Sequence, residues 1–169
     1  QVKNFLSGHS DKIKKDFADK MQSCSEKLDF ENATLWRNKI RALTSIQAFQ
    51  NINVRELGDV DIVSLYKKYN KIAIHISFMR SGSNFGDHTF FPAQAKELNS
   101  NEIISGFLSQ FYESKIPPKE IILSHSPNED KLMVEALSSI AGYKIKFTCP
   151  QKGIKKKLID ASLINAELI

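Results

Sequence analysis

Apolar residues recur at helical spacing in two runs between residues 10 and 50, with a break at Leu28-Asp29-Phe30-Glu31. In the first run they lie three or four residues apart, which predicts one apolar stripe on a helix, made of Ile13, Phe17, Met21, Cys24 and Leu28. The second run places a similar set along one face: Phe30, Ala33, Arg37, Ile40 and Leu43. We predict a helical hairpin in which Asp29 caps the second helix and Glu31 lies near the positive end of its dipole.

The second helix of this hairpin carries a further apolar line, made of Leu35, Ala42, Ile46 and Phe49. Two helices cannot cover two such lines, because each helix has only the other to pack against. The surplus surface could pack on the rest of this chain. It could also dock a matching hairpin of another protein in a four-helix arrangement, or a second copy of this chain.

After residue 50 the period changes from helical to alternating. Residues 51–58 are polar and read as a linker. The alternation predicts strands at 60–66, 71–80 and 86–91, the first with one side wetter than the other, and we expect these three to form an antiparallel meander. A continuous apolar run predicts a strand at 119–124 that is covered on both faces, and alternation returns at 143–149.

Helical spacing marks three further helices, at 99–114, at 128–141 and from Gly153 onward. Asn99 and Glu102 have the spacing of a capping box, Pro117-Pro118 is expected to end the first of these helices, and Gly142 the second. The order is therefore βββαβαβα after the hairpin. We predict an α+β chain with a mixed sheet, and this is the element order of the ribonuclease H fold.

Composition adds few constraints to this picture. The chain has 169 residues, 41% of them hydrophobic and 25% charged, as in globular proteins, and its net charge of +5 is only mildly basic. Cys24 and Cys149 fit no metal or redox spacing, so we expect two buried thiols in a reducing, cytoplasmic compartment. No apolar run is long enough to span a membrane. The absence of an initial Met and the helical pattern at Ile169 suggest a piece of a longer protein.

The hairpin resembles the UVR motif, the partner-binding hairpin of the UvrC family of excinuclease ABC proteins. The matching residues are Met21, Ser25, Leu28, Asp29, Phe30, Glu31, Ala33, Arg37 and Ile40. Cys24 stands where a small residue is usual, and Asn38 stands where Asp is usual. The resemblance implies that this hairpin binds the C-terminal hairpin of UvrB, the B subunit of the same excinuclease. It points to Phe30, Ala33 and Ile40, with Met21 and Leu28, for the apolar contact and to Glu31 and Arg37 for its polar rim.

The resemblance continues, in order, through most of the chain. It is carried by Asp59, Val60, Asp61, Arg80, Gly82, 107–112, Ile116, Pro117, Glu120, Ile121, Pro150, Gly153, Leu158, Ala161, Asn165 and Ala166. Ser81 replaces a glycine that is common after the arginine. The implied organisation is a lead-in from a cysteine-rich region at 1–9, the hairpin at 10–50, a linker at 51–58 and a ribonuclease H-like unit at 59–169. In the family, two nuclease domains outside this region incise DNA on both sides of a lesion, so the resemblance implies no catalytic residue and no cofactor here.

Ribonuclease H-type cleavage needs carboxylates from the first strand, the first helix of the unit and the fourth strand around two metal ions. The first two elements offer Asp59, Asp61 and Glu102, but the fourth offers only Ser124 and His125. We interpret the acids as surface residues that cap strand and helix ends, and the unit as catalytically silent. A metal-dependent nuclease is the alternative. The histidines share no ligand spacing, so no metal site is predicted.

Three basic groups could contact a DNA backbone. The first is the helix start at Gly153, with Lys152, Lys155, Lys156 and Lys157. The second is the turn with Lys67, Lys68 and Lys71 beside Tyr66 and Tyr69, and the third is Arg80 with Ser83 and Asn84. A solvated basic face is the alternative reading for each group. Damaged DNA is thus an expected partner of the whole complex, with direct contact by this chain left open.

Overall fold

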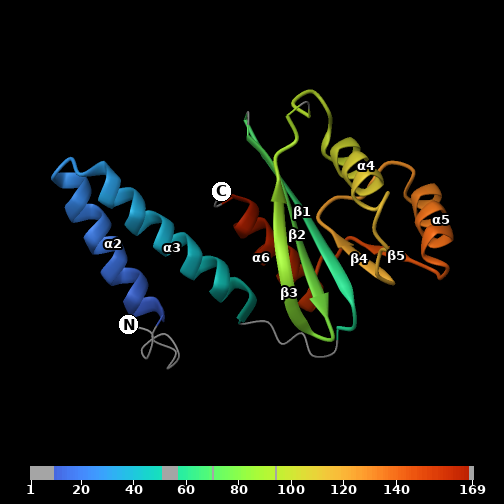
Figure 1. The fold of residues 1–169 in the computed structure, drawn as a ribbon, viewed down its shortest axis with the longest axis horizontal. Helices are drawn as coiled ribbons and strands as arrows, with labels where there is room; N and C mark the ends of the chain where they lie inside the picture. The colour runs from blue at the N-terminus through green and yellow to red at the C-terminus, as the bar shows by residue number, and fades with distance from the viewer. Residues whose placement is uncertain (1–9, 51–56, 70, 94, 168–169) are drawn as a thin grey trace. The chain divides into compact units, whose positions relative to one another are not determined.

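The structure is a computed structural model that describes residues 10–50, 57–69, 71–93 and 95–167 (Figure 1). The chain divides into two compact units, Gln1–Asn51 and Ile52–Ile169. The predicted lead-in at 1–9 and residues 51–56 of the predicted linker lie outside the described residues, as do the side chains of Ile46 and Phe49.

The first unit contains the predicted helical hairpin, formed by α2 (Ser10–Glu26) and α3 (Phe30–Gln50). The chain reverses at Leu28, whose φ of 58° lies in the left-handed region, and the amide of Asp29 donates to the carbonyl of Cys24 at 2.9 Å. Because α2 has already ended at Glu26, Leu28 does not continue the apolar stripe, and its side chain is exposed. The prediction that Leu28 belongs to that stripe is therefore wrong.

An aromatic pair packs between the two helices. Phe17 is buried, and its ring centroid lies 5.2 Å from that of Trp36. The ammonium groups of Lys20 and Lys39 lie 5.0 and 4.0 Å from the Trp36 centroid. Trp36 therefore lies on the packed face of α3, whereas Phe30 and Arg37, which we expected along one face with Ala33 and Ile40, are exposed.

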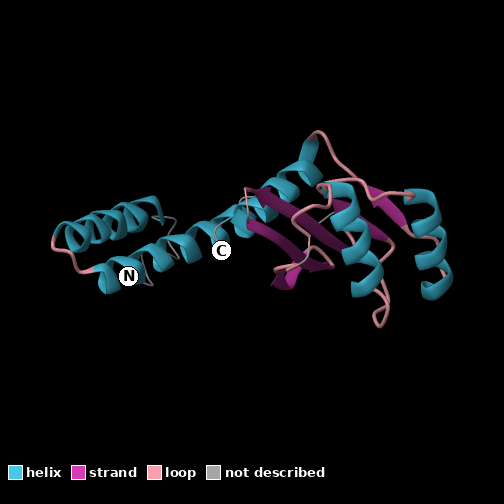
Figure 2. Ribbon diagram, turned by 90° about the horizontal axis from the view of Figure 1, so that it is seen from above, coloured by secondary structure: helices cyan, strands magenta, loops and turns pink. Residues whose placement is uncertain are grey.

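The second unit is a five-stranded mixed sheet with helices on both faces. Its strands are β1 (Val60–Lys68), β2 (Lys71–Arg80), β3 (Ser83–Phe90), β4 (Glu120–Leu123) and β5 (Lys146–Thr148). The spatial order is β3-β2-β1-β4-β5, with β1–β2 and β2–β3 antiparallel and β1–β4 and β4–β5 parallel. The helices α4 (Ser100–Phe111) and α5 (Asp130–Ala141) lie on one face, and α6 (Gly153–Glu167) lies on the other (Figure 2). The predicted α+β class, element order and meander are confirmed.

Local signals fixed several element ends. The Asn99 side chain accepts from the amide of Glu102 at 2.9 Å and the Glu102 carboxylate accepts from the amide of Asn99 at 2.7 Å, so the predicted capping box is present. Gly142 ends α5 with a left-handed φ of 75°. Helix α4, by contrast, ends at Phe111, well before Pro117, so the prolines do not terminate it.

The second and third strands join through a tighter turn than predicted. Ser81 and Gly82 have φ values of 49° and 74°, the positive pair that a two-residue hairpin turn requires. The turn therefore accommodates Ser81, which stands where the resemblance led us to expect a glycine. As a result β3 begins at Ser83, not at Gly86.

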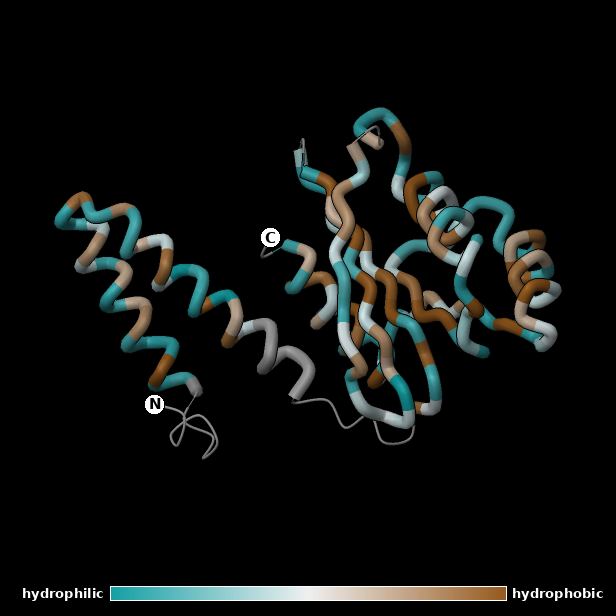
Figure 3. Tube along the Cα trace, viewed as in Figure 1, coloured by the Kyte–Doolittle hydropathy of each residue, from teal (hydrophilic) through white to brown (hydrophobic). Residues whose placement is uncertain are grey.

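The hydrophobic core lies on both faces of the sheet, where α4 covers β1 from one side, α6 covers it from the other, and α5 packs on β5. Val60 to Leu65 are all buried, and the expectation that one side of this strand is wetter is wrong. A polar pair lies under α6, where the hydroxyls of Ser64 and Ser162 are 2.7 Å apart. Figure 3 shows the contrast between the largely apolar central strands and the mixed surfaces of α2 and α3.

Candidate functional site

The hairpin exposes an apolar surface around its turn. Leu28 is 72% exposed, Phe30 63% and Leu35 56%, although all three are large hydrophobic residues. Burying such side chains is worth about 1.5–3 kcal/mol each. Phe30 and Leu35 lie five positions apart on α3 and so point about 140° apart around the helix, whereas Leu28 and Phe30 flank the turn. Leu35 was recognised in the sequence only as part of a surplus apolar line and was not predicted as a contact residue.

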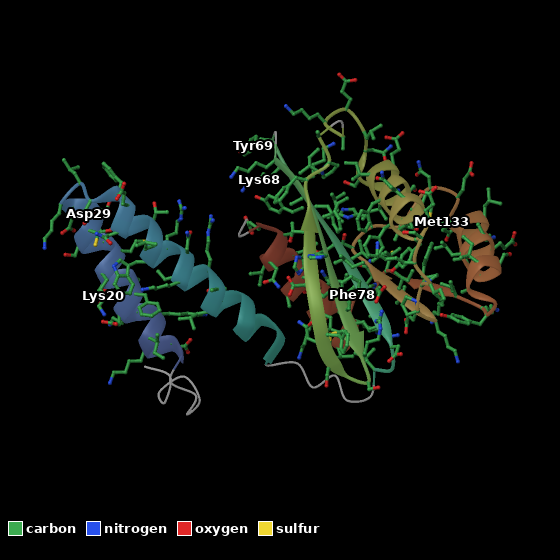
Figure 4. All side chains as sticks on the ribbon, in the orientation of Figure 1. Lys20, Asp29, Lys68, Tyr69, Phe78 and Met133 are labelled. Carbon is green, nitrogen blue, oxygen red and sulfur yellow. The ribbon has the colours of Figure 1, made fainter. Side chains whose placement is uncertain are left out.

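Asp29 fixes the start of α3 beside this surface (Figure 4). Its Oδ1 accepts from the amide of Asn32 at 3.2 Å, and its Oδ2 accepts from the Asn32 side-chain amide at 2.7 Å. These hydrogen bonds from Asn32 lower the pKa of the Asp29 carboxyl below its ordinary value. The predicted cap is confirmed, and it holds Phe30 and Glu31 in the first turn of the helix.

The other predicted contact residues divide into two groups. Glu31 and Arg37 are exposed, and Arg37 Nη2 lies 3.5 Å from Oδ1 of Asn38, the residue that departs from the motif. Three residues are half-buried within the hairpin: Met21, Ala33 and Ile40. The exposed group is available to a partner directly, whereas the half-buried group supports the helix that carries it.

At the start of β1, Asp61 is buried with 2% exposure, so its interpretation as a surface acid is wrong. Its Oδ1 accepts from Arg80 Nη1 at 2.7 Å, and its Oδ2 accepts from the Tyr112 hydroxyl at 2.7 Å. Burial raises the pKa of the Asp61 carboxyl above its ordinary value, although the hydrogen bonds from Tyr112 and Arg80 oppose this shift. Burial likewise raises the pKa of Tyr112 well above its ordinary value.

Arg80 is held by the end of the sheet. Besides Asp61, its Nη1 lies within 3.2 Å of the Val60 carbonyl and 2.8 Å of the Met79 carbonyl. The neighbouring Asp59 accepts from the amide of Ser81 at 3.0 Å and so caps the β2–β3 turn, as the capping interpretation predicted. The nitrogen of Arg80 that faces Asp61 is therefore engaged inside the unit.

The acids do not converge as ribonuclease H chemistry requires. Asp61 pairs in register with Ile121 at the start of β4, whereas Ser124 lies after the end of β4, where its amide donates to the carbonyl of Val63. Glu102 is occupied in the capping box of α4. Within the described part of the chain, no group of three His, Cys, Asp or Glu side chains is placed to hold a metal ion.

The predicted basic helix start is partly neutralised by the unit's own acids. Lys155 Nζ lies 2.6 Å from Oε1 of Glu120, and Lys156 pairs with Asp160 at 2.5 Å. Partial burial works to raise the pKa of Glu120, but hydrogen bonds from Lys155 and Thr148 outweigh it and the pKa is lowered. Lys152 and Lys157 are exposed.

The prediction that both cysteines are buried is wrong. Cys24 is half-buried, Cys149 is exposed, and both are free thiols. Partial burial of the Cys149 thiol nevertheless raises its pKa above the ordinary value for cysteine. Among the described residues, no helix is both long enough and apolar enough to cross a lipid bilayer.

Comparisons with known proteins agree with both units. Residues 59–169 match the family model described as the UvrC Ribonuclease H-like domain, and residues 11–46 match the UvrB/uvrC motif. UvrABC system protein C of Paramagnetospirillum magneticum is 39% identical over 98% of this chain and 27% of that protein. The proteins of the same name from Bradyrhizobium diazoefficiens and Ruegeria pomeroyi are 38% and 37% identical over 98% of this chain and 24% and 26% of theirs.

The fold and these matches define the chain as a helical hairpin of the UvrB/uvrC type followed by a ribonuclease H-like unit. The chain belongs to the UvrC family. It spans about a quarter of the length of the curated relatives it matches.

Proposed function

We propose that this chain is the adaptor region of a UvrABC excision-repair nuclease, which incises DNA on both sides of a lesion. Its hairpin recruits the UvrC protein to the C-terminal hairpin of UvrB. The observation that carries this proposal is the exposure of the large apolar side chains of Leu28, Phe30 and Leu35 on a hairpin that matches the UvrB/uvrC motif. A second hairpin laid against it would bury these side chains in a four-helix arrangement.

We further propose that the sheet unit is a catalytically silent spacer that positions the two nuclease domains outside this chain. The engagement of Asp61 by Arg80 and Tyr112 supports this role, because a metal ion would have to displace both donors. The alternative of a metal-dependent nuclease predicts that Asp61→Asn abolishes cleavage by the isolated chain in the presence of Mg²⁺ or Mn²⁺. If the sheet unit is catalytically silent, neither the natural chain nor Asp61→Asn will cleave DNA under these conditions.

Titration calorimetry of the chain against the C-terminal hairpin of UvrB tests the recruitment role. We expect saturable binding that Phe30→Ala weakens at least tenfold, because truncating a central aromatic contact typically costs about 2 kcal/mol or more. The matched control is Leu132→Ala, which removes a 60% exposed side chain from α5 and should not change the affinity. The affinity should fall little with salt, since the contact is mainly apolar.

Absence of binding to a folded partner hairpin would refute the recruitment role. Equal losses of affinity in Phe30→Ala and Leu132→Ala would show that the partner does not bind specifically at the hairpin surface. Self-association through the same surface is measured in parallel by sedimentation of the chain alone, and Phe30→Ala should reduce it if the hairpin pairs with its own copy.

A further inference from the structure

The sheet ends in a short edge strand, β5. It is the last strand in the spatial order, and none of the described residues pairs with it on the side away from β4. On the β4 side, the amide of Lys146 donates to the carbonyl of Lys119 at 2.9 Å. Neighbouring residues of a strand turn their backbone groups to opposite sides, so the N–H and C=O of Phe147 point away from β4.

Helix α5 lies beside this edge and covers only part of it (Figure 1). The hydroxyl of Ser138 accepts from the amide of Ile145 at 2.9 Å and so occupies the edge just before β5. Beyond this point a hollow of about 490 Å³ opens between α5 and β5, and Val134 and Phe147 contribute to its apolar lining. Both of these side chains are half-buried. The outward backbone groups of Phe147 therefore lie next to an apolar hollow.

Lysines dominate the rim of this hollow. Lys131 comes from α5, Lys144 and Lys146 come from β5 and the segment before it, and all three side chains are exposed. Among the residues that the structure describes, these lysines form no ion pair. Asp130 also lines the hollow, and its Oδ1 accepts from the amide of Lys131 at 2.7 Å. We use the name β5 edge for this surface, made of Lys131, Val134, Lys144, Lys146 and Phe147.

The lysines decide which kind of strand the β5 edge can accept. A second copy of β5 would bring lysines against lysines, and like charges opposite each other destabilise a strand pair. Opposite charges in the same position stabilise it. Because side chains alternate along a strand, Lys144 and Lys146 share one face and Phe147 lies on the other. A strand with acidic side chains at alternate positions and apolar ones between them is therefore complementary to this edge.

We propose that the β5 edge binds an extended acidic segment of another protein, which joins the five-stranded sheet as a sixth strand. Its backbone pairs with Phe147, its carboxylates contact Lys144 and Lys146, and its apolar side chains enter the hollow beside α5. In strand addition, backbone hydrogen bonds supply affinity and the alternate side chains supply specificity. Nucleic acid is less complementary, because its phosphates would meet the lysines but it has no peptide groups to pair with the edge.

Fluorescence anisotropy with the whole 169-residue chain tests this surface. The probe is a fluorescein-labelled peptide of about eight residues in which Glu and Val alternate. We expect saturable binding. A second peptide with the same residues, arranged as a block of Glu followed by a block of Val, should bind at least about threefold more weakly. The two peptides carry equal charge, so a difference between them reports recognition of the alternating pattern.

Paired lysine variants locate the binding site. Lys144→Gln with Lys146→Gln should weaken binding of the alternating peptide at least about threefold, because two opposite-charge contacts are lost. The matched control is Lys68→Gln with Lys71→Gln, which removes the same charge from exposed positions at the β1–β2 turn and should leave the affinity nearly unchanged. Circular dichroism of each variant verifies that it is folded.

Amide hydrogen exchange tests the backbone contact separately from the charges. Saturating alternating peptide should slow exchange of the Phe147 amide at least about tenfold, because this N–H gains a carbonyl partner. The amide of Lys146 already donates to Lys119 in the free chain, so its exchange should slow much less. Equal slowing of the two amides would contradict strand addition.

Three further results would overturn the proposal: no saturable binding of the alternating peptide, equal affinities for the two peptides, or equal losses in the two lysine pairs. Displacement of the alternating peptide by an equal concentration of oligothymidine would assign the lysines to nucleic acid and would also overturn it. UvrB is absent from these experiments. Their failure therefore leaves the Phe30→Ala calorimetry unaffected, and failure of that calorimetry leaves peptide binding at the β5 edge unaffected.

Discussion

Removal of one hydroxyl, in Tyr112→Phe, tests whether the buried Asp61 carboxylate organises the end of the sheet. The Tyr112 ring is 1% exposed and its hydroxyl is a donor to Asp61 Oδ2 at 2.7 Å. The substitution leaves the ring packed but deprives a buried carboxylate oxygen of its partner. Hydrogen bonds to charged groups contribute about 1.5–3 kcal/mol. For a unit of this size such a loss lowers the midpoint of thermal unfolding by about 6–12 °C.

The assay is thermal and urea unfolding followed by circular dichroism at pH 7. Tyr143→Phe is the matched control, because its hydroxyl donates to the neutral carbonyl of Pro117 and its ring is 37% exposed. We expect this control to cost about 1 kcal/mol or less. Equal losses in the two variants would refute the reasoning, since the charge and burial of Asp61 would then contribute nothing beyond an ordinary hydrogen bond.

Three further predictions concern stability. Burial raises the pKa of Asp61 in the folded state, so the stability that this group contributes is greatest below its unfolded pKa and is lost as pH rises through its folded pKa. Over this pH range, the unfolding free energy of the natural chain should therefore fall relative to that of Asp61→Asn. A constant difference between the two chains in urea unfolding at several pH values would contradict the shift. Asn99→Ala should destabilise the sheet unit by about 1 kcal/mol in urea unfolding, whereas Asn99→Asp, which keeps the cap, should not. Leu28→Gly should stabilise the hairpin in urea unfolding, read by Trp36 fluorescence, by up to about 1 kcal/mol because it relieves a left-handed φ, yet it should weaken partner binding; a fall in both would argue against strain at this turn.

Sequence signals that act over a few residues predicted local structure well. Asp29 and Asn99 cap helices because their side chains reach amides three residues away, which requires no knowledge of the rest of the fold. The strand Lys71–Arg80 was predicted with its observed bounds, since strict alternation over ten residues leaves little choice of register. The resemblance to the UVR motif added the prediction that the hairpin is a contact element.

Features that depend on distant neighbours could not be predicted in the same way. Asp61 was assigned to the surface because acids are seldom buried unpaired, and its partners Arg80 and Tyr112 come from β2 and the end of α4. Leu28 fits a helical stripe by spacing, but α2 ends at Glu26 and the chain turns at Leu28. The hollow beside α4 joins residues from β3, the following loop and α4, which only the folded sheet unit brings together.

We propose that the hairpin binds UvrB and that the sheet unit takes no part in this contact. Amide chemical shifts of the isotope-labelled chain, recorded while the C-terminal hairpin of UvrB is added, test it most directly. We expect the largest shift changes at Leu28, Phe30, Glu31, Leu35 and Arg37, with the resonances of β1 to β5 unchanged. Shifts centred on the sheet unit, or none at saturating partner, would contradict it.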